Sequence, residues 1–164
     1  MSTTTPIIES LLSYIHTQLS GITIASGYRT NIAKVSRKLL AIEEVGESDF
    51  PILFPIISGE DMSDLTNREI ESDFNFKIIG YIHHDELNLT TGQSASELLI
   101  KVISDVKEKL YGLYIANRFG LTTDVFTIRK VNTDEGVLEP YAAFSLECSV
   151  KISYSATDTG RIVQ

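Results

Sequence analysis

The sequence predicts an α+β domain in which two main helices pack on one face of a mostly antiparallel β-sheet. The first observation is the order of the expected elements, α-β-β-β-α-β-β, in which a helix precedes each of two groups of strands. The second is the alternation of apolar and polar residues over residues 70–84 and 140–154, which is typical of strands with one buried face. The length of 164 residues suits one domain, assigned to residues 1–154, followed by a flexible C-terminal tail over residues 155–164.

Both helices are predicted from apolar residues at helical spacing. The first covers residues 6–20, with Thr5 as its N-cap and Pro6 at the first helical position, where the missing N–H costs nothing. The second begins at Ser94, which forms a capping box with Glu97. The residues expected on the solvent side of this second helix are Lys101, Asp105, Lys107 and Glu108.

The segment between the first helix and the first long strand is harder to assign. Residues 33–43 fit neither the helical nor the strand period, and a strand is favoured over a short helix. Pro51 and Pro55 exclude a helix interior and a central strand, so residues 52–58 are predicted as a short edge strand. The polar stretch 58–67 is predicted as a loop.

The C-terminal part of the chain is predicted to form two antiparallel strands over residues 123–132 and 140–154, joined by a loop. The second of these alternates without interruption, so a shift of one residue would turn its apolar row to water. The side chains predicted to point inward are Phe144, Leu146, Cys148, Val150, Ile152 and Tyr154. Those predicted to point outward are Ser145, Glu147, Ser149, Lys151 and Ser153.

Composition excludes several classes of function. Fourteen basic residues stand against 22 acidic ones, and a net charge of −8 argues against binding to nucleic acid or to an anionic membrane. Cys148 is the lone cysteine, so no internal disulfide can form, as expected for a reducing cytoplasm. No apolar run reaches the roughly 18 residues of a transmembrane helix, and no basic region precedes the first apolar stretch as in a signal peptide.

Four adjacent residues, His83, His84, Asp85 and Glu86, are the first candidates for a metal or acid–base site. His83 and His84 are neighbours at the end of a predicted strand, where their side chains point to opposite faces. No ligand spacing typical of zinc is present, so a solvated strand end is favoured and no metal or cofactor is expected. Cys148 falls on the apolar face of its strand and is predicted to be an inert thiol.

Two groups of charged residues are candidates for contacts with other proteins. Arg29, Lys34, Arg37 and Lys38 lie within ten positions, and they form either a solvated face or a patch that meets an acidic surface on a neighbouring subunit. Glu60, Asp61 and Asp64 belong to the predicted polar loop. They lack the residue order of a calcium loop, so a solvated loop is favoured over a calcium site, and they are kept as interface candidates.

Several stretches together resemble the tail terminator (tail completion) proteins of long-tailed bacteriophages. They are GYRTNIAKVSRKLL, DFPILFPIISGED, FNFKIIGYIH, SASELLIKVISDVKEKLY and ECSVKISYSA, in that order. The Y-x-T after a glycine, the acid-x-Pro pair before an apolar strand and the alternating last strand carry the resemblance, and the order of elements covers nearly the whole chain.

The resemblance implies a structural assembly protein without a catalytic site or a cofactor. Family members form a ring, typically a hexamer, at the head-facing end of the tail tube. The ring ends tube polymerisation and joins the tail to the head-side connector, and DNA passes through its channel without specific binding. The tail tube protein and the connector are the implied partners, with the sheath protein as a further candidate. The implied location is the tail and neck of the virion, after assembly in the host cytoplasm.

Two alternatives remain open. One is another phage neck or tail tube component. The other is a small metal-dependent enzyme that uses residues 83–86.

Overall fold

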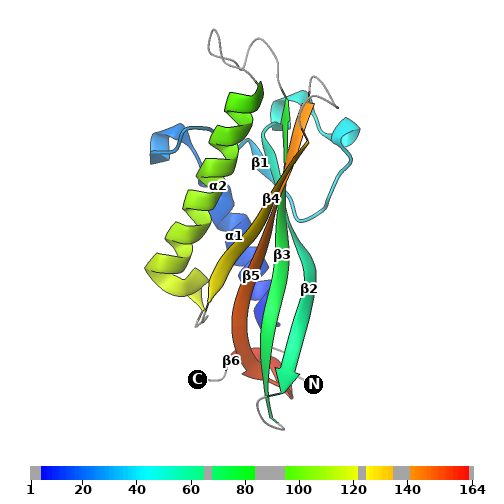
Figure 1. The fold of residues 1–164 in the computed structure, drawn as a ribbon, viewed down its shortest axis with the longest axis vertical. Coiled ribbons are helices and arrows are strands. Elements are labelled where there is room, and N and C mark those ends of the chain that lie inside the picture. Colours follow the sequence, from blue (N-terminus) through cyan, green and yellow to red (C-terminus); the bar gives the residue numbers. More distant parts are fainter. Residues whose placement is uncertain (1–4, 65–67, 84–94, 122–124, 135–140, 163–164) are drawn as a thin grey trace.

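The two helices lie in one layer against one face of a sheet in the computed structural model, which describes residues 5–64, 68–83, 95–121, 125–134 and 141–162 (Figure 1). Within these residues the α-helices are α1 (Ile7–Leu19) and α2 (Ala95–Asn117). The strands are β1 (Lys34–Val35), β2 (Ile52–Asp64), β3 (Glu69–His83), β4 (Phe126–Asp134), β5 (Tyr141–Ser155) and β6 (Asp158–Ile162). The sheet order is β1-β2-β3-β5-β4, and β6 pairs with β5. Only β1 and β2 run parallel among these pairs, so the predicted α+β class is confirmed.

The long central strands have the predicted register. On β3 and β5 the facing pairs Phe74–Val150, Phe76–Cys148 and Ile78–Leu146 all point toward the helices. Each of these six side chains is at most 2 % exposed. The apolar stripes of α1 and α2 complete the same core, because one buried stripe on a helix fits one buried row on each strand.

Strand β2 differs most from the prediction, because it continues through the stretch that was expected to be a loop. A bulge separates Ile57 from Gly59, whose φ of 147° is a conformation that favours glycine. Beyond the bulge, residues as far as Asp64 pair with β3. Backbone hydrogen bonds extend a strand whatever its side chains are, so the polar composition of residues 58–64 concealed it.

The segment before β2 was also assigned only in part. Of the predicted strand 33–43, only Lys34 and Val35 form β1, and residues 42–44 form a 3₁₀ turn. Residues 39–50 cross to the second face of the sheet (Figure 1). There a smaller apolar cluster forms from Leu40, Ile42, Val45, Phe50, Ile52, Phe54, Ile79, Tyr81 and Tyr141. Leu40, Ile42 and Val45 are partly buried against this face of the sheet and do not extend it, which explains why residues 39–45 lack a strand period.

Two side chains predicted to face water are buried. Asp105 of α2 is fully buried, because the loop before β1 packs over it. Ser149 of β5 is 6 % exposed, because Arg129, which sits at a bulge in β4, lies over it and donates a hydrogen bond of 3.1 Å to its Oγ. The pattern of apolar residues along one strand or helix does not predict that a different segment of the chain will pack over its polar side.

The two ends of the described chain also differ from the prediction. Helix α1 begins at Ile7, and its N-cap is Pro6 without a side-chain cap, so Thr5 does not cap the helix. The segment expected to be a flexible tail contains β6, which pairs with β5 after a turn. In that turn the Ser155 Oγ accepts a hydrogen bond of 3.3 Å from the Thr157 amide, so local polar contacts form the turn without an apolar pattern.

Candidate functional site along strand β2

The outer edge of β2 is the longest uncovered strand edge in the part of the chain that the structure describes. Its first two residues, Ile52 and Leu53, pair with β1, and Pro55 follows directly. From Pro55 to Asp64 no described strand pairs with the outer side. Proline fits this position because its missing N–H is not needed at a free edge. An edge of this length presents backbone donors and acceptors to an incoming strand.

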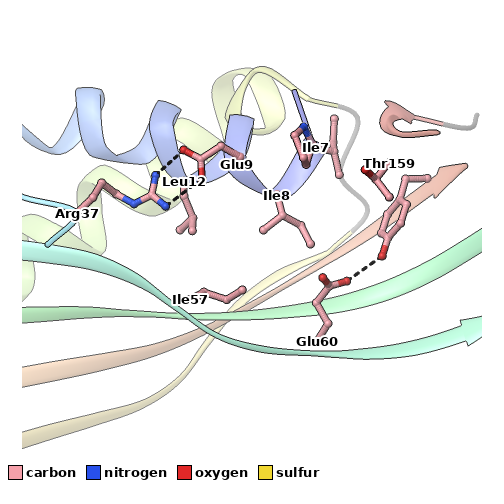
Figure 2. Close-up of a pocket in the computed structure, with 10 residues that line it drawn as sticks. Ile7, Ile8, Glu9, Leu12, Arg37, Ile57, Glu60 and Thr159 are labelled. Atoms are coloured by element: carbon pink, nitrogen blue, oxygen red, sulfur yellow. Dashed lines mark hydrogen bonds and ion pairs between the residues drawn. The ribbon is translucent and has the colours of Figure 1, made fainter. Parts of the chain in front are cut away.

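A groove of about 330 Å³ follows this edge between α1 and the strands β2, β5 and β6 (Figure 2). Ile7, Ile8 and Leu12 line it from α1, and Ile57 lines it from β2. Ile57 is 58 % exposed although it shares the face of the sheet that carries the core. Met62, further along the same edge, is 63 % exposed. The edge thus combines unpaired backbone groups with apolar side chains that remain in contact with water.

One end of the groove is polar, and a carboxylate there accepts hydrogen bonds from two neighbouring strands. Glu60 of β2 accepts a hydrogen bond of 3.0 Å from the Tyr154 Oη (Figure 2) and one of 2.6 Å from the Ser72 Oγ. Burial raises the pKa of Tyr154 to about 12, and the neighbouring Glu60 adds to this rise. The phenol therefore stays protonated at neutral pH and remains a hydrogen-bond donor, which fixes β2 across β3 to β5.

The other end of the groove carries an ion pair. Arg37 donates through both terminal nitrogens to the two carboxylate oxygens of Glu9, at 3.0 and 3.1 Å (Figure 2). The Ser13 Oγ donates a third hydrogen bond, of 2.9 Å. Arg37, and then Ser13, lower the pKa of Glu9 below its usual value. This bidentate contact attaches the segment after β1 to the first turn of α1.

Three of the four basic interface candidates have an acidic partner within the described chain. Besides Arg37 with Glu9, Arg29 contacts both Asp105 and Glu108, at 3.0 and 2.8 Å. The Lys34 Nζ lies 3.2 Å from the Asp49 carboxylate. Lys38 is exposed. The cluster in the sequence is thus divided among separate contacts, and its role in binding another subunit stays a prediction.

The acidic candidates also separate. Glu60 lies on the helix side of the sheet, whereas Asp61 lies on the opposite face, where its carboxylate accepts a hydrogen bond of 3.3 Å from the Asn75 side chain. Asp64 is the last residue of β2. The structure therefore brings Glu60 to the groove and leaves Asp61 on the open face of the same edge.

The candidate metal cluster lies mostly outside the described residues, because these include His83 but not His84, Asp85 or Glu86. The His83 ring packs against the rings of Phe50 and Tyr141, with centroid distances of 5.6 and 5.0 Å. Within the described ranges, no group of three potential metal ligands occurs.

The buried thiol of Cys148 is 2 % exposed, and burial raises its pKa to about 12. It is thus protonated at neutral pH, in agreement with the prediction of an inert thiol.

The family of known proteins described as Bacteriophage Tail Tube Terminator Protein matches residues 1–160. The chain belongs to this family. No curated protein matches the chain. This tail tube terminator is therefore a structural protein of a phage tail, as the resemblance implied. None of its described helices is long and apolar enough to cross a membrane.

Sequence reasoning missed the edge of β2 in the terminator's candidate site, and elsewhere it missed a buried carboxylate. The edge of β2 was missed because residues 58–64 carry no apolar alternation. The buried Asp105 was assigned to the solvent side of α2, although it stands seven residues after Leu98 and so shares the edge of the apolar stripe. That spacing was the available signal.

Proposed function

We propose that this tail tube terminator assembles into a ring of identical copies, a hexamer, that caps the tail tube. The ring ends polymerisation of the tube and offers its other side to the head-side connector. The observation that carries the proposal is the free edge of β2 with its exposed Ile57 and Met62, in a chain whose family is that of tube terminators.

A free strand edge with exposed apolar side chains is expected to bind another protein surface. An open strand with apolar neighbours favours uncontrolled association unless a specific contact covers it. Two different surfaces that meet on successive copies form a heterologous contact, and such contacts close into a ring when the rotation per subunit fits. A ring also matches the shape of a tube end. A ring of terminator subunits would therefore cover the free strand edge of each subunit and stop the growth of the tube.

Charge supports a channel through which DNA passes without specific binding. The chain carries 22 acidic and 14 basic residues, and Arg29, Lys34 and Arg37 already contact acids of the same chain. A channel lined by an excess of carboxylates would repel the phosphates of the DNA.

The partners in this proposal are the tail tube protein on one side of the ring and the connector on the other. A sheath protein is a further candidate. Lys38 is exposed and follows the groove-lining Arg37 in the chain, so in this proposal Lys38 meets an acidic partner near the β2 edge. Assembly in the host cytoplasm and incorporation into the virion tail and neck complete the proposal.

The test is complementation of a phage that lacks this protein, with tails measured by electron microscopy. Without the protein we expect overlong tubes and unjoined heads and tails; tails of normal length joined to heads would overturn the proposal. The purified wild-type protein should have the mass of a closed ring of 18.2 kDa subunits.

A pair of matched variants tests the surface. Met62→Glu places a charge on the β2 edge, and Ile115→Glu places the same charge on α2, where Ile115 is 78 % exposed. We expect Met62→Glu to lose complementation and Ile115→Glu to keep it. The reverse result would assign the contact to the helix layer instead of the β2 edge.

A further inference from the structure

We propose that successive copies join edge to edge, with β2 of one copy pairing antiparallel with β4 of the next copy. This inference rests on the proposed ring and names the contact that closes it. Strands β2 and β4 are the two long edges of the sheet, because the order is β1-β2-β3-β5-β4 and β1 covers only two residues of β2. The contact would make the sheets of all subunits continuous.

Strand direction favours this pairing. Strands β2 and β5 are both antiparallel to β3, and β4 is antiparallel to β5, so β4 runs opposite to β2 within one chain. A rotation about an axis parallel to the strands keeps every strand direction. The β4 strand of the next copy therefore arrives antiparallel to β2, and the antiparallel pattern of the long strands continues without a break. The two edges are different surfaces, so the contact generates a ring and not a closed dimer.

The side of the sheet that faces the helices is apolar at both edges. On β2, Ile57 and Met62 share the face that carries Phe76, and they are 58 % and 63 % exposed. On β4, Val131 stands opposite Leu146 on this same face and is 38 % exposed. Placed side by side, Met62 and Val131 would cover one another, as apolar neighbours on adjacent strands do.

The open side of the sheet carries opposite charges at the two edges. On β2, Asp61 faces this side next to Asp73 of β3. On β4, the exposed residues are Arg129, which lies at the bulge, and Lys130, which stands opposite Glu147. Residues 58–64 of β2 include three acidic residues and no basic one, and of the acids Asp61 faces this side, whereas Glu60 faces the helices. Pairing the edges would thus bring Asp61 near these two cations, and opposite charges on neighbouring strands attract.

The available length of β4 limits the pairing to its second half. The Ile128 amide donates a hydrogen bond of 3.5 Å to the Tyr111 Oη of α2, so this position is already directed to the helix layer. From Lys130 to Asp134 no described strand pairs with the outer side of β4. This length matches the part of β2 beyond its own bulge at Gly59, so each bulge marks the start of the edge that the neighbouring copy covers.

The first test exchanges the charges and measures the mass of the assembly by light scattering. Lys130→Glu and Asp61→Lys each set like charges against each other, and we expect each to weaken the contact about fivefold and to reduce the ring fraction. The double variant restores opposite charges and should restore the ring. Lys107→Glu, the same change on α2, is the matched control and should assemble like the wild type.

The second test is a chemical cross-link between neighbouring copies, which detects the contact without weakening the assembly. Asp61→Cys with Lys130→Cys, treated with a short bismaleimide linker, should give a ladder of covalent multiples of 18.2 kDa. The native Cys148 is buried and does not compete. A wild-type ring that gives no ladder, and that the single charge reversals leave intact, would overturn the β2–β4 contact while the proposed function stands. A wild-type protein that forms no ring, alone or on tubes, would overturn both.

Discussion

Replacing Asp105 with alanine should destabilise the protein more than any change to its exposed ion pairs. The carboxylate is fully buried on α2. It accepts hydrogen bonds from the amides of Arg29 and Thr30, at 3.0 and 2.8 Å, and from the Thr30 hydroxyl at 2.7 Å. These contacts join the loop before β1 to a helix about 75 residues away in the sequence.

The magnitude follows from the donors that the change leaves behind. Each buried donor without an acceptor costs about 1–3 kcal/mol, so the buried amide and hydroxyl of Thr30 together give a loss of about 2–6 kcal/mol in the free energy of unfolding. Asp105→Asn keeps one oxygen acceptor for these donors and should lose less than half as much. Glu108→Ala removes an acid from the same Arg29 guanidinium, but this pair lies in water, where solvent screens it, so little change is expected.

The assay is a urea titration followed by circular dichroism, with all variants at one protein concentration because the proposed assembly would make the midpoint depend on concentration. Equal losses for Asp105→Ala and Glu108→Ala would refute the reasoning, because the buried donors would then contribute nothing measurable.

Two further predictions concern packing and pH. A Cβ at Gly80 would overlap the Phe144 ring, so Gly80→Ala should cost about 1–3 kcal/mol, whereas Gly112→Ala, with open space in α2, should stabilise by about 0.5–1 kcal/mol; urea titrations that rank them the other way would contradict this packing. Burial raises the pKa of both Cys148 and Tyr154 to about 12, so the stability they contribute is fully present below pH 9 and is lost as the pH rises toward 12. Thermal melts across that range should show a smaller alkaline loss for Tyr154→Phe than for the wild type.

The residues along the edge of β2 would set the register of an incoming strand in the proposed ring. Its bulge turns Ile57 and Met62 toward the same side of the sheet, while Asp61 faces the other side. An incoming strand would thus meet apolar groups on one face and a negative charge on the other. Register and partner are then specified together, which an edge with like residues on both faces would not achieve.

The sequence by itself determined the elements whose signal is local. The sequence predicted two helices, α1 and α2, and two long strands, β3 and β5. Each of them buries one stripe or one row of side chains, and the spacing of apolar residues in the sequence shows this periodicity directly. The family followed from the same order of elements, and its match over residues 1–160 confirms the resemblance.

Only the tertiary structure decided what depends on segments far apart in the chain. The extension of β2 rests on backbone hydrogen bonds to β3, which leave no mark on side-chain type. The partners of Arg29 and Arg37 lie 76 and 28 residues away, so a cluster of cations in the sequence became separate ion pairs in the fold. Asp105 and Ser149 are buried because other segments cover them. Periodicity shows which face of a helix or strand is apolar. Whether a polar side chain is buried, which strands pair and which charges form ion pairs depend on the other segments that pack against that helix or strand.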